Sequence, residues 1–145
     1  MIGDWLNDDT PVKEIAMFAE KTFAQNDLSG FKGDPQFAQN SYSHKMFSKL
    51  RSSIAGLYEW RFKHATEAAD KERMARATDL ALRQALALCP YSPEAVFHYV
   101  TFLNTQNRNA DAMWVATTAL KQPLLPEENR KSLYDFVEFL KKAAK

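Results

Sequence analysis

Apolar residues recur at three- and four-residue steps along most of the chain, which is the spacing of one face of an α-helix. The first such pattern follows Thr10 and Pro11 and ends near Asn26. Thr is a good N-cap and Pro suits the first helical position, so we predict a helix there. A second, longer helix is expected after a cap at Ser41 or Ser43. Its apolar stripe is expected to face the core, although one member is an arginine: Phe47, Leu50, Ile54, Leu57, Arg61 and Ala65.

Four further helices are predicted downstream, and the Gly- and Pro-containing stretch 27–35 is predicted to be a loop. The third helix follows a break near residues 68–70, and the next three begin at Ser92, Asn109 and Pro126. Each has an inward face of small or apolar side chains, which are in chain order: Met74, Ala77, Ala81, Ala85 and Leu88; Val96, Tyr99, Val100 and Leu103; Ala112, Val115, Ala116 and Ala119; Leu133, Phe136, Val137 and Leu140.

The composition agrees with an all-α protein. The 145 residues include 20 Ala and 14 Leu but 5 Val, 3 Ile and 4 Gly, a balance that favours helix over strand. The chain is long enough for one domain with a core of its own. The single cysteine, Cys89, excludes an internal disulfide and a cysteine-based zinc cage, and we expect it to be a buried small side chain. No run approaches the roughly 18 apolar residues of a membrane span.

Two of the predicted helices repeat each other at an offset of 34 residues. Thr78, Leu82 and Ala85 of the third helix correspond to small residues of the fifth, namely Ala112, Ala116 and Ala119. A unit of two helices with this period is typical of helical repeat arrays, in which small residues let neighbouring helices approach closely. The alternative is a plain helical bundle in which the similarity is accidental.

The chain therefore resembles tetratricopeptide-repeat proteins. The resemblance implies an antiparallel helix-pair stack, with residues 1–40 as an N-terminal helix and loop, 41–92 as a first pair, 93–126 as a second unit and 127–145 as a capping helix. The N-terminal helices are likewise expected to act as caps. The match is incomplete, because Val100 stands where the family has glycine.

A narrower resemblance covers roughly residues 28–122. The segments 56–61 (GLYEWR) and 84–97 (QALALCPYSPEAVF) are similar to the C-terminal region of a bacterial family of multispanning, protein O-mannosyltransferase-like membrane proteins. This resemblance implies a glycosyltransferase-like parent, a location on the extracytoplasmic side of the membrane, and an appendage that positions a substrate or partner. Without it, a cytoplasmic location is expected. It implies no catalytic residue in this chain.

No pattern in the sequence indicates catalysis, a cofactor or a metal. His44, His64 and His98 are far apart and have no second ligand at helical spacing, and no phosphate-binding or dinucleotide-binding motif is present. The loop 27–35 lacks the ligand spacing of a calcium loop. We therefore expect a non-enzymatic chain without cofactors.

The charge is nearly balanced overall but unevenly distributed. The net charge is +1, while residues 1–40 hold 3 basic and 7 acidic side chains and residues 41–90 hold 9 basic and 5 acidic ones. Acids are interleaved with the bases in the middle region, which favours a solvated surface over a nucleic-acid site.

The repeat resemblance implies a concave groove lined by the first helix of each pair. The groove positions carried over are Trp60, Lys63, Glu67, Glu94, Phe97, Thr101 and Asn104. Aromatic anchors and polar side chains on such a face predict a protein-protein interaction module that binds a protein or peptide segment. Two alternatives stay open: the chain's own helices fill the groove, or Tyr58 and Trp60 only pack the second helix against the third.

Overall fold

A computed structural model of the chain describes residues 1–143, and within this range every regular element is helical. The predicted all-α class is confirmed. The elements in chain order are α1 (Val12–Ala19), which continues into the π-helical turn η1 (Glu20–Ala24), α2 (Pro35–Ala38), α3 (Ser41–His64), α4 (Ala68–Leu88), α5 (Pro93–Thr105), α6 (Asn109–Leu120) and α7 (Glu127–Ala143). No helix in this part of the chain combines the length and apolarity that crossing a bilayer requires.

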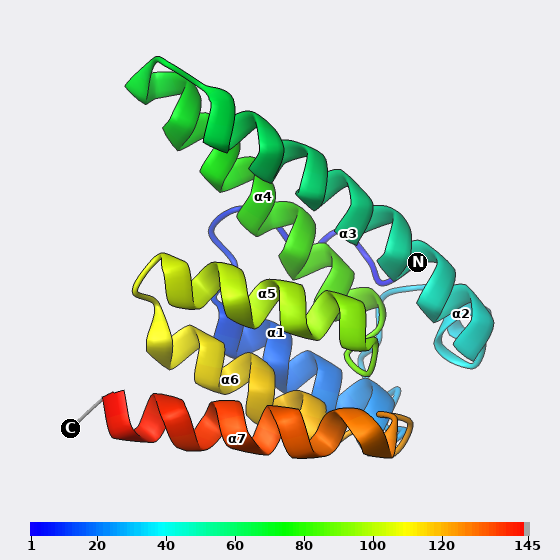
Figure 1. The fold of residues 1–145 in the computed structure, drawn as a ribbon. Coiled ribbons are helices and arrows are strands. Elements are labelled where there is room, and N and C mark those ends of the chain that lie inside the picture. Colours follow the sequence, from blue (N-terminus) through cyan, green and yellow to red (C-terminus); the bar gives the residue numbers. More distant parts are fainter. Residues whose placement is uncertain (144–145) are drawn as a thin grey trace.

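The helices form two antiparallel pairs, α3 with α4 and α5 with α6, and α7 lies along α6 (Figure 1). Helix α5 packs against both helices of the first pair. The positions related by the 34-residue offset are all fully buried at these contacts: Thr78, Leu82, Ala85, Ala112, Ala116 and Ala119. Small side chains at equivalent positions therefore allow close packing in both pairs. The far ends of α3 and α4 project beyond the other helices (Figure 1).

The first helix does not cap the stack as expected. Helix α1 packs against α4 and α6, the second helix of each pair, and its buried side chains include Val12 and Ile15. The main contacts of α3 are with α4, α5 and the four-residue α2. One side of α3 is therefore left without a neighbouring long helix among the described residues.

Helix α3 turns the opposite face to the core from the one that its apolar stripe predicts. Leu50 and Leu57 are 57% and 54% exposed, and the buried positions are instead Ser48, Ser52 and Ala55, together with His44. These small residues let α3 approach the alanine-rich α4 closely, and the Ser48 hydroxyl donates a 2.9 Å hydrogen bond to the Ala85 carbonyl. Close packing of small residues thus outweighs the burial of larger side chains on this helix.

Several helix ends differ from the predicted ones. The side chain of Asn40, rather than Ser41 or Ser43, caps α3 by accepting from the Ser43 amide. Helix α3 ends at His64, slightly before the predicted break. The Ser92 cap of α5 is confirmed, because its hydroxyl accepts from the amide three residues on.

Two features near the N-terminus also differ from the prediction. Thr10 makes no cap for α1, and its hydroxyl instead bonds the backbone of Trp5 and Asn7. The short helix α2, which begins at Pro35 and is capped by Asp34, starts within the region expected to be a loop.

The N-terminal segment is held to the helices by one arginine and a group of aromatic rings. Arg83 on α4 donates to the backbone carbonyls of Asp8 and Thr10. Phe18 on α1 packs against the rings of Trp5 and Phe31, with ring centroids 4.8 and 6.1 Å apart. The aromatic side chains near the N-terminus therefore anchor this segment.

Candidate interaction surface

The predicted groove residues lie at the C-terminal end of α3, at the N-cap of α4 (Glu67) and along α5. Trp60 is 57% exposed and stacks on the His64 ring, with ring centroids 4.3 Å apart. The charged and hydroxyl side chains among them are exposed: Lys63, Glu67, Glu94 and Thr101. Phe97 and Asn104 are half-buried. The chain's own helices therefore leave most of these side chains open to solvent.

A hydrogen-bonded bridge joins α3 to α5 beside Trp60. Glu59 on α3 is 2.9 Å from Nε2 of His98 on α5, and its other carboxylate oxygen is 3.0 Å from Nζ of Lys63. Partial burial alone raises the pKa of Glu59, but the hydrogen bonds from His98 and Lys63 outweigh it and the pKa is lowered. Lys63 is therefore engaged within the fold. No sequence pattern pointed to His98, which holds the two helices of this face together.

The outward side of α3 carries a stripe of apolar side chains, interrupted by the exposed Ser53 and Arg61, which we call the α3 ridge. Its six members are exposed large hydrophobic side chains at helical spacing, with exposed fractions of 39–72%: Tyr42, Met46, Phe47, Leu50, Leu57 and Trp60. Ile54 on the same side is half-buried. Scattered exposed apolar residues are common, but a contiguous patch along one helix marks an interaction site. The sequence contains part of this signal, but Phe47, Leu50 and Leu57 are predicted there to face the core.

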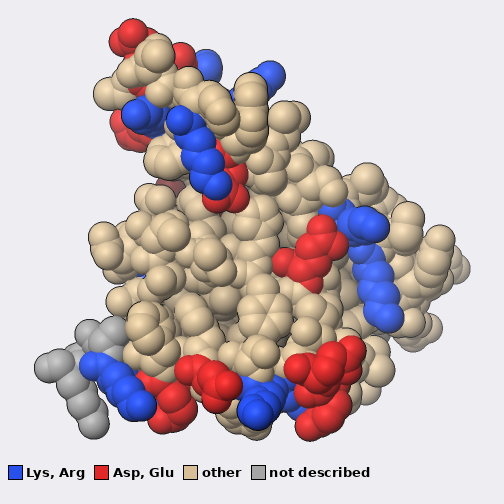
Figure 2. Space-filling model, in the orientation of Figure 1, with Lys and Arg blue, Asp and Glu red and all other residues tan. Residues whose placement is uncertain are grey.

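Charged side chains are segregated from the middle of the molecule. Figure 2 shows Lys, Arg, Asp and Glu gathered at the tip where α3 meets α4 and along α7, with a further acidic and basic group at the right end of α5 and otherwise largely uncharged surface over α5. The tip contributes Glu67, Asp70 and Glu72, and the last two pair with Arg73 and Arg76. A partner on the α3–α5 side therefore meets mainly apolar and neutral groups along α5, with the exposed Glu94 in its first turn.

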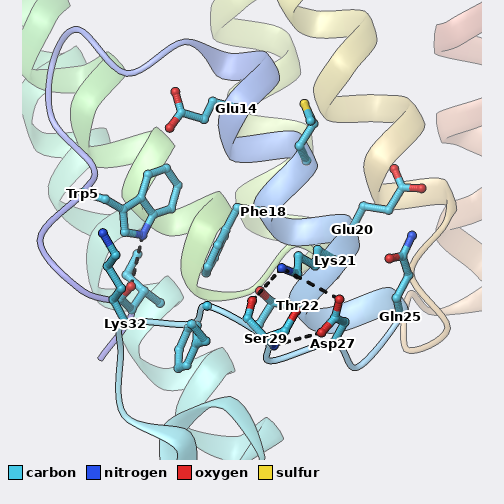
Figure 3. Close-up of a pocket in the computed structure, with 14 residues that line it drawn as sticks. Trp5, Glu14, Phe18, Glu20, Lys21, Thr22, Gln25, Asp27, Ser29 and Lys32 are labelled. Carbon is cyan, nitrogen blue, oxygen red and sulfur yellow. Dashed lines mark hydrogen bonds and ion pairs between the residues drawn. The ribbon is translucent and has the colours of Figure 1, made fainter.

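A cavity of about 620 Å³ opens between the N-terminal segment, α1 and the loop after η1 (Figure 3). Trp5, Phe18 and Phe31 form its apolar wall. On its polar edge, the Lys21 ammonium is already bound within the fold, because it donates to the Ser29 carbonyl at 2.6 Å and pairs with Asp27 at 3.8 Å. None of the predicted groove residues lines this cavity.

The buried titratable groups of this chain have structural roles. Cys89 is fully buried, and burial raises the pKa of its thiol to about 11, so it stays protonated. His44 is buried between the Tyr91 hydroxyl at 2.8 Å and the Phe37 carbonyl at 2.6 Å. Within residues 1–143 no group of three or more His, Cys, Asp or Glu side chains is placed to hold a metal ion.

Comparison with models of known protein families, with curated proteins and with solved structures finds no match for this chain. The resemblances to tetratricopeptide repeats and to the membrane-protein family therefore stay predictions. The interpretation of the surface formed by α3 and α5 depends on the exposure, contacts and charges of its side chains.

Proposed function

We propose that this chain is a non-catalytic protein-protein interaction module that binds a partner segment on the side formed by α3 and α5. The α3 ridge carries the proposal. Six large apolar side chains on one helix would otherwise remain in water at a cost of about 25 cal/mol for each Å² left exposed, so covering them stabilises a complex.

The neighbouring groove residues extend this surface. Trp60 lies at the end of the ridge, and the Glu59–His98 bridge fixes α3 against α5 beside it. Phe97 immediately precedes His98 and is half-buried, so it offers part of its ring to a bound segment. Aromatic side chains in such positions are frequent hot spots of binding.

The architecture supports the same interpretation. Stacked helix pairs bury each face against the next pair, and an end of the stack needs a polar outer face to remain in water. Helix α7 supplies such a face beyond α6, because its outward positions are mostly charged: Lys131, Asp135, Glu138 and Lys142. Helix α3, at the other end, presents its apolar ridge.

The test is a comparison of three proteins as bait in a lysate of the source organism. They are the wild type, the ridge variant Leu50→Ser/Leu57→Ser, and a control with Tyr134→Ser on α7, whose side chain is 55% exposed. Equal helical content by circular dichroism is established first. We expect a protein that wild type and control retain and the ridge variant loses, and that binds the purified chain directly.

A Trp60→Ala/Phe97→Ala variant in the same experiment shows whether the groove residues take part. Retention of every partner by both the ridge variant and this variant would contradict the proposed function.

A further inference from the structure

The ridge is bordered by basic side chains. Helix α3 contains five Lys or Arg residues, and its first 18 residues contain no acid. With 100° between successive residues, Lys45, Lys49 and Lys63 lie along one border of the ridge. Arg51 lies on the other border, and Arg61 lies on the line of the ridge itself, four residues after Leu57. The single acid of the helix, Glu59, is already bound by Lys63 and His98.

A second copy of the chain is a poor occupant of this surface. Symmetric pairing of two α3 helices places the same basic borders against each other, and like charges across an interface oppose association. Head-to-tail stacking instead brings the ridge against the outward face of α7, which carries exposed charges such as Lys131 and Glu138. The exposed rings of α7, Tyr134 and Phe139, lie to the sides of these charges, so neither arrangement sets an apolar stripe directly against the ridge.

An anionic bilayer fits the ridge less well than a narrow partner does. The ridge is one helix wide and ends at the tip that carries Glu67, Asp70 and Glu72. A flat surface that touches α3 along its 24 residues, about 36 Å, also meets these acids. A helix lying along α3 contacts the ridge and its basic borders without reaching the tip.

We propose that the α3 ridge binds an acidic amphipathic helix of a partner protein, an inference that rests on the proposed function. Met46, Leu50 and Leu57 follow one another at steps of four and seven, so a partner helix of about four turns lying along them matches the apolar length. Its apolar residues, at steps of three and four, pack on the ridge. Its Asp and Glu residues reach Lys45 and Lys49 on one border and Arg51 on the other.

Two synthetic peptides test the proposal. Both are 18-residue amphipathic helices with identical Leu positions, and the flanking positions carry Glu in one and Lys in the other. Fluorescence anisotropy with the whole protein measures their affinities. We expect the Glu peptide to bind at least tenfold more tightly than the Lys peptide, and its affinity to fall as salt rises from about 50 to 300 mM.

Variants locate the site. Leu50→Ser/Leu57→Ser is expected to weaken the Glu peptide at least tenfold, and Lys45→Glu/Lys49→Glu to reverse the preference between the two peptides. The matched controls on α7, Tyr134→Ser and Lys131→Glu, leave both affinities unchanged. Amide chemical-shift changes on adding the Glu peptide are expected to centre on residues 42–61.

Four results would overturn the proposal. Equal binding of both peptides would remove charge as the basis of recognition. Binding of neither peptide, with a lysate partner still lost by the ridge variant, would refute the partner class and leave the interaction module intact. A ridge-dependent dimer in analytical ultracentrifugation would identify a second copy as the occupant. Ridge-dependent flotation with vesicles of 30% anionic lipid would identify a membrane.

Discussion

The hydroxyl of Tyr99 on α5 donates a 2.8 Å hydrogen bond to the carboxylate of Asp79 on α4. The same carboxylate accepts from Arg83 at 2.7 Å and from Arg108 at 2.8 Å. Since Arg83 also holds the carbonyls of Asp8 and Thr10, this one acid joins the first helix pair, the second pair and the N-terminal segment. Asp79 is therefore the centre of a partly buried polar network.

Asp79→Ala is expected to destabilise the fold strongly. The side chain of Arg83 is only 9% exposed, and breaking a buried ion pair by removing one partner typically costs about 3–5 kcal/mol. Tyr99→Phe removes one bond while the arginines remain paired, so we expect about 1.5 kcal/mol. Urea unfolding followed by circular dichroism measures both. Equal, small losses for the two variants would contradict the central role of Asp79.

The same network predicts sensitivity to acid. Burial of Asp79 alone raises the pKa of its carboxyl, but the bonds from Arg83, Arg108 and Tyr99 outweigh burial and the pKa lies below its usual value. A lowered pKa in the folded state gives stability that is present above the unfolded value, about 4, and is lost as pH falls below it. We expect the free energy of unfolding of Asp79→Asn to change less between pH 5 and pH 3 than that of wild type.

His44 predicts a second pH dependence at a higher pH. Burial lowers the pKa of His44, and the carbonyl of Phe37 beside Nε2 implies that Nε2 carries the proton while Nδ1 accepts from Tyr91. In the unfolded chain the His44 imidazole gains a proton as the pH falls below about 6.5, whereas in the folded chain it stays neutral to lower pH. The free energy of unfolding therefore falls as pH drops through that region. Melting temperatures at pH 7.5 and 5.5 test this. A His44→Gln variant should be less stable at pH 7.5 but show a smaller decrease between the two pH values.

Cys89 is expected to react only when the protein unfolds. The thiolate is the reactive form, and a fully buried thiol with a pKa of about 11 supplies almost none of it at pH 8. Iodoacetamide labelling followed by mass spectrometry is expected to be slow in buffer and rapid in denaturant. Rapid labelling of the native protein at the same pH would show that Cys89 is accessible.

The sequence was sufficient for the helices but not for the orientation of one of them. The predicted apolar faces of α5 and α6, including Val96, Leu103 and Val115, are buried. Helix α3 has two usable faces, one large and apolar around Leu50 and one small around Ser48. The alanine-rich surface of α4 favours the small face, and this contact between two helices does not follow from the local pattern of α3.

The candidate site could be predicted only in part, because the sequence pattern places the large apolar face of α3 in the core. Trp60 follows from the repeat offset, but three of the six ridge residues, Phe47, Leu50 and Leu57, belong to the stripe predicted to face the core. The bridging role of His98 depends on a contact between residues 39 positions apart. Neither the ridge nor the bridge follows from local spacing.

The orientation of α3 is itself testable by a pair of substitutions two residues apart. Ser48 is fully buried against α4, so Ser48→Leu forces a larger side chain into close packing and removes the bond to Ala85, at a cost of about 2–3 kcal/mol. Leu50→Ser changes an exposed side chain and is expected to alter stability by about 0.5 kcal/mol or less. If the predicted apolar stripe faced the core instead, the order would be reversed, with Leu50→Ser the more damaging substitution. Chemical unfolding of the two variants at pH 7.5 distinguishes these orientations, and the result decides whether the α3 ridge is free to bind a partner.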